Sequence, residues 1–375
     1  MVKQPDVIII GAGVMGCSVA WRLAKAGLKP LVLERSVPGA EASSAAAGIL
    51  APMVEAHHER SVARPAAALQ LGIRSRELHA TQADELREAH GLDIGYRRCG
   101  VMRVAFDEHD REDLREHVAL VPELRLIDAD DALELEPSLS KDVCGALLAD
   151  TEAQLEPRRL LDALAIAAER AGAVFRTGAF VQRLEAGAHP RVELGDETFS
   201  AEHVIVAAGS WTHLIPGLEA HVNLDAVGLH PVRGQIVATR TRPPLFRRVV
   251  FGGGGYVVTR PDGRVLVGST EERVGFRREV TFEGMRSILG IGMRVAPSLG
   301  RAAVLDHWSS FRPGTSDGLP LVGAVGRGVW LASGHFRNGI LLAPITAEIL
   351  AASILGGEPI PGADAIEPSR FGGGA

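Results

Sequence analysis

The sequence is poor in residues that would support disulfides, cysteine metal sites or nucleic-acid binding. It has three cysteines among 375 residues, scattered and odd in number, so we expect reduced thiols rather than a disulfide framework. A net charge of −6 provides no concentrated basic face, which argues against nucleic-acid binding. Only four of the 40 basic residues are lysines, so an arginine needs specific local context before it is assigned to a ligand.

The sequence also lacks the segments that direct a chain to a membrane. No apolar run reaches the roughly 18–20 residues of a membrane span. The N-terminal stretch MVKQPDVIII has no basic region followed by a small-residue cleavage site, so we expect a cytoplasmic protein. The chain is typical of a globular protein with two domains, because single cores seldom exceed roughly 250–300 residues.

A βαβ unit is present at the start of the chain. DVIII (6–10) predicts a buried strand, GAGVMG (11–16) follows, and a helical pattern then runs to Gly27. PLVLER (30–35) predicts a second strand. This order of elements implies a parallel sheet.

The glycines between the first strand and the helix fit the G-x-G-x-x-G pattern. Gly11 permits the tight turn, Gly13 lets a pyrophosphate approach the backbone, and Gly16 lets the helix and strand pack closely. Glu34 ends the second strand, where its carboxylate can accept hydrogen bonds from a ribose hydroxyl. This context favours dinucleotide binding over a merely glycine-rich turn, and the carboxylate disfavours NADP because it would repel a 2′-phosphate.

ASSAAAGIL (42–50) stands where NAD enzymes commonly place a second mononucleotide unit. Its small residues suit an extended cofactor that lies close to the backbone, with Ser43 and Ser44 near phosphate or flavin polar atoms. The alternative is an ordinary helix-packing segment.

The rest of the chain predicts an α/β (α+β) protein. Helices are expected over 66–91 and 157–172, a β-hairpin over 256–268, and a surface loop with a short helix over the acidic stretch 128–137. We expect a Rossmann-like domain with a parallel sheet and a second, β-rich domain. The first is assigned to 1–90, 150–215 and 315–375, and the second to 91–149 and 216–314.

GHFRNGILLAP (334–344) predicts a second strand-to-helix turn of the same sheet. Its small residues allow close backbone approach, and the helix that follows Gly339 directs N–H groups and a positive dipole end toward a ligand. His335 and Arg337 lie at this junction.

Five segments together resemble the glycine oxidase branch of the D-amino-acid oxidase family of flavoproteins. They are the opening βαβ unit, SSAAAGIL (43–50), VAAGSW (206–211), FRPGT (311–315) and GHFRNGILLAP. They occur in order over nearly the whole chain, and the last is the most specific to this branch. The resemblance implies FAD, a β-rich substrate domain and oxidative deamination of small amines.

The resemblance also implies the residues around the cofactor. The backbone of 337–341 is expected to lie against the pyrimidine edge of the flavin. The expected cofactor contacts are Gly11, Gly13, Val14, Met15, Gly16, Glu34, Arg35, Ala42, Ser43, Ser44, Ala47, Gly48, Ile49, Val181, Ala208, Gly209, Trp211, His335, Phe336, Arg337, Asn338, Gly339, Ile340 and Leu341. Covalent attachment through a C-terminal cysteine is not expected, since no cysteine follows Cys144.

For the substrate, the resemblance points to Tyr256, Arg312 and Arg337. Transfer of a hydride from an amino acid mainly requires that the carboxylate be held so that the Cα–H bond points at the flavin. A planar guanidinium does this with two parallel hydrogen bonds, each contributing roughly 1.5–3 kcal/mol. Arg337 has two interpretations: it contacts the substrate, or it closes the site from behind.

Three further features receive no catalytic role. His57 and His58 predict a surface or lid segment, and FGGGGY (251–256) a flexible lead-in to the strand of Tyr256. Glu271 stands where some glycine oxidases carry an apolar pocket residue, which leaves the preferred substrate open.

The expected activity is oxidation of glycine, sarcosine or small D-amino acids to oxo acid, ammonia and hydrogen peroxide, in thiamine biosynthesis. The alternatives are a D-amino-acid or sarcosine oxidase of the same fold, a flavin dehydrogenase with another acceptor, and a non-catalytic FAD-binding subunit. Arg312 and Tyr256 argue against the last, because a structural subunit needs no carboxylate clamp. The resemblance also implies a homo-oligomer, a tetramer.

Overall fold

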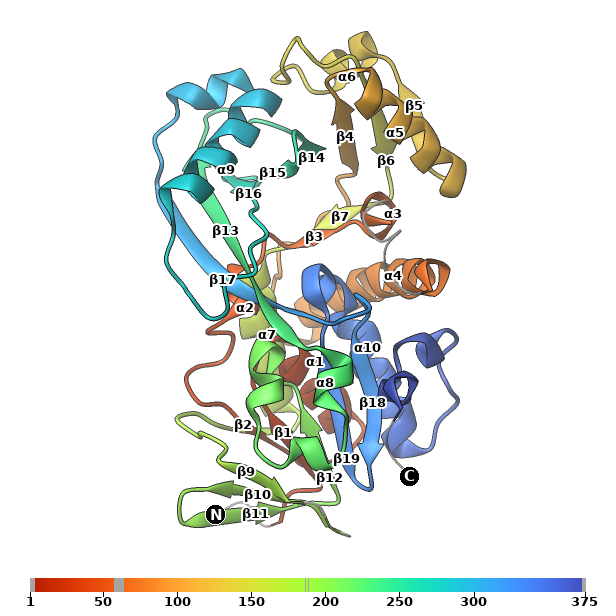
Figure 1. Ribbon diagram of the computed structural model, residues 1–375, viewed down its shortest axis with the longest axis vertical. Coiled ribbons are helices and arrows are strands. Elements are labelled where there is room, and N and C mark those ends of the chain that lie inside the picture. Colours follow the sequence, from red (N-terminus) through yellow and green to blue (C-terminus); the bar gives the residue numbers. More distant parts are fainter. Residues whose placement is uncertain (1–3, 57–63, 186, 188, 373–375) are drawn as a thin grey trace.

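The computed structural model describes residues 4–56, 64–185, 187 and 189–372. Two large sheets lie toward opposite ends of its long axis, with the helix α4 (Pro65–His90) between them (Figure 1). The histidines at positions 57 and 58 lie outside the described residues.

The first sheet has six strands in the order β18-β19-β12-β1-β2-β8. From β19 to β8 neighbouring strands are parallel, and β18 is antiparallel to β19. Along β1, Val7 and Ile9 enter the core on one face while Ile8 and Ile10 enter the core on the other, which explains an uninterrupted apolar run. The strands are β1 (Val7–Ile10), β2 (Pro30–Leu33), β8 (Val174–Arg176), β12 (His203–Val206), β18 (Leu321–Gly326) and β19 (Val329–Ser333).

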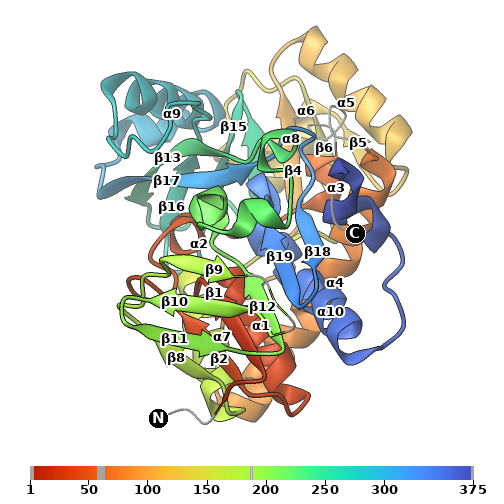
Figure 2. The same cartoon turned by 60° about the horizontal axis from the view of Figure 1, so that its bottom comes forward.

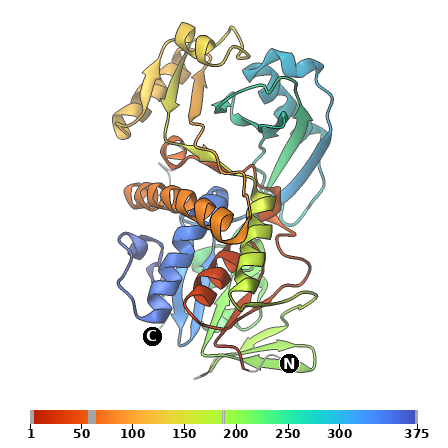
Figure 3. The same ribbon diagram turned by 180° about the vertical axis from the view of Figure 1, so that it is seen from behind.

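Helices cover one face of this sheet, and a small antiparallel sheet packs on the other face, where Leu184 and Val192 share a core with Ile8 of β1. Figure 3 shows red α1 and yellow-green α7 side by side, and α10 packs on both α1 and α4. The three-stranded sheet comes forward in Figure 2. These elements are α1 (Val14–Lys25), α7 (Pro157–Arg170), α10 (Gly339–Leu355), β9 (Arg183–Glu185), β10 (Arg191–Leu194) and β11 (Glu197–Ser200).

The second sheet has eight strands in the order β17-β13-β16-β15-β14-β4-β6-β5. All its neighbours are antiparallel except β14 and β4. Helix α9 packs on β13 to β16, and α5 packs on β4 and β6. The elements are β4 (Val101–Ala105), α5 (Glu108–Leu120), β5 (Arg125–Ile127), α6 (Ala129–Leu135), β6 (Gly145–Ala149), β13 (His230–Arg240), β14 (Val249–Gly252), β15 (Gly255–Thr259), β16 (Arg264–Gly268), α9 (Phe282–Val295) and β17 (Asp306–Gly314).

Short elements connect the two sheets and shape the site between them. Strands β3 and β7 pair with each other at the junction. The short elements are α2 (Ala42–Ala45), β3 (Ile49–Leu50), α3 (Pro52–Glu55), β7 (Ala153–Gln154), η2 (Gly209–Leu214), η3 (Leu218–Ala220), α8 (Leu224–Val227), η4 (Pro297–Arg301), η5 (Phe336–Asn338), η6 (Ala363–Ile366) and η7 (Pro368–Phe371).

The predicted mixed α/β fold with a parallel sheet is confirmed, but two local predictions were wrong. Within 91–149, assigned to the β-rich domain, we expected only a short helix near 128–137, but α5 also lies there. Its buried side chains are only Leu114 and His117, so helical periodicity is weak in the sequence. Residues 251–256 form a β-hairpin rather than a flexible lead-in, because Gly253 and Gly254 adopt positive φ angles of 62° and 85° at its turn. All strands of the eight-stranded sheet fall within 91–149 and 216–314.

One described segment, Phe336–Leu355, is long and apolar enough to cross a membrane, with a mean hydropathy of 1.7. It is not an uninterrupted apolar run, because Arg337 and Glu348 lie within it. In the fold 61% of it is buried, because α10 packs against α1 and α4. Its apolar character is that of a core helix.

Candidate functional site

A single cavity runs between the two sheets and joins both predicted parts of the site. At one end it is lined by Gly11, Glu34 and Val181 of the first domain. At the other end it is lined by Tyr256 and Arg312 of the eight-stranded sheet. An extended cofactor in this cavity would therefore reach a group that binds carboxylates.

The glycine loop leaves the N-terminus of α1 open to the cavity. Gly11 has a φ of +103°, and a Cβ atom there would lie 2.6 Å from the carbonyl oxygen of Ala207. The helix has Gly13 as its N-cap, no side-chain cap and no acidic residue in its first turn. The N–H of Val14 donates to Ser43, and the other N–H groups of the first turn and the positive dipole end suit a pyrophosphate.

Glu34 is held in place for a ribose. Its Oε2 atom accepts from the backbone N–H of Ala12 at 2.9 Å, and Oε1 accepts from that of Ser36 at 2.8 Å. A carboxylate has about four acceptor positions, so ribose hydroxyls can still bind. Beside it, the Arg35 guanidinium lies 4.1 Å from the ring centroid of Trp211, which also lines the cavity.

Two side chains of the second domain bind the backbone of the cofactor loop 42–49. Arg260, 2% exposed, donates from Nη2 to the carbonyl oxygen of Ala47 at 2.6 Å. Trp308 donates from Nε1 to the carbonyl oxygen of Ala45 at 2.9 Å. On the side of the first domain, the Oγ atom of Ser43 accepts from the N–H of Val14, the first residue of α1, at 3.0 Å. The loop is therefore held by hydrogen bonds to both domains, and a cofactor bound on it would lie across their junction.

Arg312 projects into the cavity from β17 and covers Gly234, where a Cβ atom would collide with its guanidinium. It donates from Nη1 to the carbonyl oxygen of Thr270 at 3.1 Å and from Nη2 to the Oγ atom of Ser269 at 2.6 Å. Burial lowers the pKa of Arg312, yet a guanidinium remains protonated in proteins. Its remaining N–H donors are available to a substrate carboxylate.

Tyr256 lies next to this guanidinium. It is 8% exposed, and its ring lies edge-on to that of Phe251 at a centroid distance of 6.0 Å. The phenol extends over Gly268, where a Cβ atom would lie 2.7 Å from the hydroxyl oxygen. Tyr256 and Arg312 thus line the same end of the cavity.

Arg337 is engaged by two carboxylates. Its Nε and Nη2 atoms donate to Oε2 and Oε1 of Glu55 at 3.0 and 3.2 Å, and Nη1 lies 3.5 Å from Oε2 of Glu271. Glu55 is the main cause of the raised pKa of Arg337. Arg337 also lines a second cavity on the other side of Phe336. These contacts favour the interpretation that Arg337 closes the site from behind.

His335 lies at the start of the predicted flavin turn and is neutral. It is 4% exposed, and its Nε2 atom lies 3.0 Å from the Oγ1 atom of Thr346. Burial lowers its pKa to about 3. The adjacent Phe336 has a φ of +44°, and α10 begins at Gly339.

This neutral histidine predicts a specific loss of stability in acid. Below a pH of about 6.5 the unfolded chain protonates His335 but the folded chain does not, so the free energy of unfolding falls by about 1.36 kcal/mol per pH unit down to the folded pKa. Between pH 6.5 and 5, the free energy of unfolding of His335→Asn should therefore fall by about 2 kcal/mol less than that of the wild type. Denaturant unfolding with saturating cofactor measures both values. His109→Asn, at an exposed position, should follow the wild type, and parallel curves for all three proteins would contradict the assignment.

The structure places most of the predicted site residues on this one cavity. Three of the predicted cofactor residues do not line it. Gly16 packs against the carbonyl of Gly11, Ser44 donates to the carbonyl of Gly39, and Leu341 lines the second cavity.

Sequence reasoning missed several residues at the site. Glu41, Glu55, Ser269 and Ser310 line the cavity, and the buried Oγ atom of Ser310 has no hydrogen-bond partner within the described chain. None of the four belongs to a motif that carried the resemblance, although Glu41 and Ser310 stand just before two of these motifs. Arg260 gave no signal, because one buried arginine is not distinguishable from the many others in the chain.

Comparison with known proteins supports the same assignment. The pattern of the family described as FAD dependent oxidoreductase matches residues 6–353. The chain is 35% identical to the glycine oxidase of Geobacillus kaustophilus over 361 residues, which cover 94% of this chain and 93% of that protein. The crystal structure of that glycine oxidase superposes with a TM-score of 0.87 at 33% identity, over 98% of both chains.

A second relative is a longer protein. The chain is 35% identical to the bifunctional protein ThiO/ThiG of Synechocystis sp. over 99% of its own length but 55% of that protein. The cavity residues described above fit FAD, since they offer an open helix N-terminus, a ribose acceptor and a long groove of small residues. The chain therefore belongs to the FAD-dependent oxidoreductase family: it is an FAD-dependent enzyme of the amino acid oxidase type, similar in sequence and fold to glycine oxidases.

Proposed function

We propose that the protein oxidises glycine and other small amines, among them sarcosine and small D-amino acids, to the oxo acid, the free amine (ammonia, or methylamine from sarcosine) and hydrogen peroxide. One observation carries this proposal. Of the arginines that line the cavity in the described parts of the chain, Arg312 alone has no carboxylate partner, since Arg35 pairs with Glu41 and Arg337 with Glu55. Arg312 is therefore the group with charge to offer a substrate carboxylate.

The residues bind and orient the substrate rather than supply proton chemistry. Arg312 binds the carboxylate through its free donors, and Ser269 and Thr270 prevent the guanidinium from rotating. Tyr256 limits the space beside the bound carboxylate. Bound FAD would supply the two-electron oxidation of the Cα–N bond, with oxygen as the final electron acceptor. The substrate is left as an imine, which water hydrolyses to the oxo acid and the free amine.

The turn 335–341 supplies backbone groups to the cofactor. His335 is neutral and adds no positive charge, so the N–H groups and the dipole at the start of α10 are the groups that would stabilise negative charge on the flavin ring. A role of the product in thiamine biosynthesis is part of the proposal and is supported by the similarity to ThiO/ThiG. A tetramer and a cytoplasmic location remain predictions.

Anaerobic mixing of the FAD-loaded protein with glycine, sarcosine, D-alanine and D-proline tests the proposal. We expect glycine to bleach the flavin absorbance and peroxide to appear when air is readmitted. Bleaching without peroxide would instead indicate a dehydrogenase. If none of these amines reduces the flavin, the proposed function is wrong.

A further inference from the structure

Residues 270–281, which we name the strap, connect β16 to α9 and contact residues at both the substrate end and the cofactor end of the cavity. At its start the carbonyl of Thr270 accepts from Arg312, and Glu271 pairs with Arg337. Further along, the ring of Phe276 stacks on Trp211 at a centroid distance of 5.1 Å. Arg278 then pairs with Glu41, at the edge of the cofactor loop 42–49. The position of the strap therefore determines the surroundings of both substrate and cofactor.

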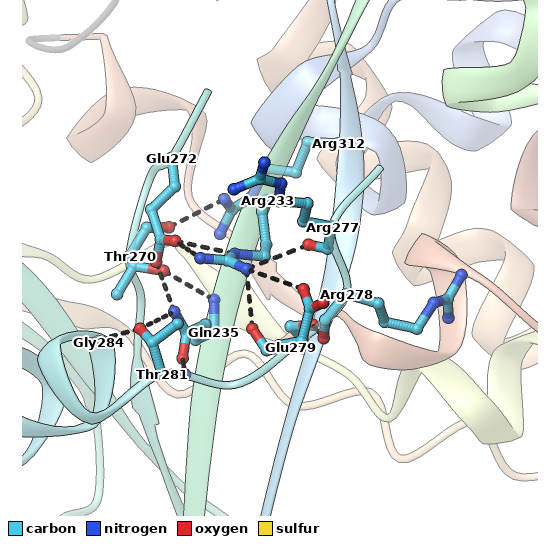
Figure 4. Close-up of polar contacts among 11 residues, drawn as sticks. Arg233, Gln235, Thr270, Glu272, Arg277, Arg278, Glu279, Thr281, Gly284 and Arg312 are labelled. Atoms are coloured by element: carbon cyan, nitrogen blue, oxygen red, sulfur yellow. Dashed lines mark hydrogen bonds and ion pairs between the residues drawn. The ribbon is translucent and has the colours of Figure 1, made fainter. Parts of the chain in front are cut away.

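A buried arginine on β13 fastens the strap at three points (Figure 4). Arg233, 4% exposed, donates from Nε to Oε2 of Glu272 at 2.8 Å, and its Nη2 atom contacts the same oxygen. Its Nη1 atom donates to the carbonyl oxygens of Arg277 at 3.1 Å and Glu279 at 2.8 Å. One guanidinium thus joins the beginning and the end of the strap.

Gln235 completes the attachment from the same face of β13. Its Nε2 atom donates to Oε1 of Glu272 at 2.6 Å, and its Oε1 atom accepts from the N–H of Thr281 at 3.0 Å. Its backbone N–H donates to the Oγ1 atom of Thr270 at 2.9 Å. Both oxygens of Glu272 are therefore occupied within the network.

The two faces of β13 contact different groups, the strap on one side and Arg312 on the other. Side chains alternate along a strand, so Arg233 and Gln235 point to one face while Gly234 leaves the other face open. The guanidinium of Arg312 lies on that open face, over Gly234. The acceptors that orient it, Ser269 and Thr270, belong to the backbone segment that Arg233 and Glu272 hold from the opposite face.

We propose that Arg233 and Glu272 are positioning residues, which orient the Arg312 guanidinium for the substrate carboxylate by fixing the strap. This inference rests on the proposed function, because it concerns the same carboxylate site. Bidentate binding tolerates little displacement of the fork, since a site must be held within roughly 0.5 Å of its productive geometry. Release of the strap frees Ser269 and Thr270 and allows the fork to rotate. Affinity for any carboxylate then falls, while the glycine loop that binds the pyrophosphate is untouched.

Two variants and one control test this inference in the FAD-loaded protein. Arg233→Met removes every side-chain contact of this residue to the strap and leaves its two backbone hydrogen bonds with Glu272 in place. Glu272→Gln keeps the shape of the side chain but removes its charge. The control, Glu136→Gln, weakens another ion pair of the same domain, next to β14, in which Oε1 of the buried Glu136 lies 3.4 Å from Nη1 of Arg248. Acetate is the probe, and its dissociation constant is read from the change in the flavin absorbance spectrum. Thermal unfolding of each protein records the loss of stability separately.

We expect Arg233→Met to raise the dissociation constant of acetate at least about tenfold and the KM for glycine in parallel, with a smaller change in kcat and with FAD retained. Glu272→Gln should raise the dissociation constant of acetate by about threefold. Glu136→Gln should lose stability but bind acetate with the wild-type dissociation constant. If Arg233→Met fails to fold, Glu272→Gln decides. Variants that bind acetate as the wild type does overturn the positioning role. A wild type that binds no acetate and is not reduced by glycine overturns the proposed function itself.

Discussion

Replacing Arg312 with lysine is expected to lower kcat/KM for glycine by about 100-fold to 10,000-fold, mainly through KM, while FAD remains bound. The estimate follows from two charge-assisted hydrogen bonds of roughly 1.5–3 kcal/mol each, converted at about 1.4 kcal/mol per tenfold. An ammonium group is a single point charge, and it cannot contact Ser269, Thr270 and both oxygens of a carboxylate at once. Steady-state kinetics with glycine, together with the flavin spectrum of the purified variant, measure both parts of the expectation.

Arg125→Lys provides the control for this substitution. Arg125 lies in the same eight-stranded sheet, and its ion pair with Asp150 is exposed. The kinetic constants of this variant should equal those of the wild type. A KM of Arg312→Lys that also equals the wild-type value would remove Arg312 from the substrate site.

Gly11→Ala is expected to yield a protein that is purified without its flavin. The backbone there has a φ of +103°, and the new methyl group would lie 2.6 Å from the carbonyl oxygen of Ala207. The turn must therefore shift, and the N–H groups at the start of α1 shift with it. We expect FAD affinity to fall at least about 100-fold, measured by titration of the apoprotein with FAD.

Gly27→Ala separates this effect from backbone strain alone. Gly27 also has a positive φ, +92°, but a Cβ atom there meets nothing within 4 Å. This variant should lose some stability and keep its flavin. Equal FAD affinity in Gly11→Ala and Gly27→Ala would show that close packing at Gly11 is not what shapes the cofactor turn.

The parts of this site that the sequence predicted are those that depend on local rules. The turn of Gly11 and Gly13 follows from a strand, a helix and close backbone approach within a few residues. The turn at 335–341 is a second strand-to-helix connection of the same sheet, with the short helix η5 between β19 and α10. Both line the cavity, as does the hairpin strand that carries Tyr256.

The parts that the sequence could not predict depend on which distant segments come together. The sequence left two roles open for Arg337, contact with the substrate or closure of the site from behind. Its bond to Glu55, 282 residues earlier in the chain, favours the second. The contact of Arg260 with Ala47 spans 213 residues. Helix α5 was not predicted for another reason. Most of its side chains are polar and only two are buried, too few to produce a helical period in the sequence.

A crystal structure of the FAD-loaded protein with acetate tests the central claim most directly, namely that one cavity holds the flavin and a carboxylate clamp side by side. We predict that the carboxylate will accept hydrogen bonds from Arg312, and that the pyrimidine edge of the flavin will lie on the backbone of 337–341. A carboxylate bound away from Arg312, or a flavin ring that does not contact this turn, would contradict the account.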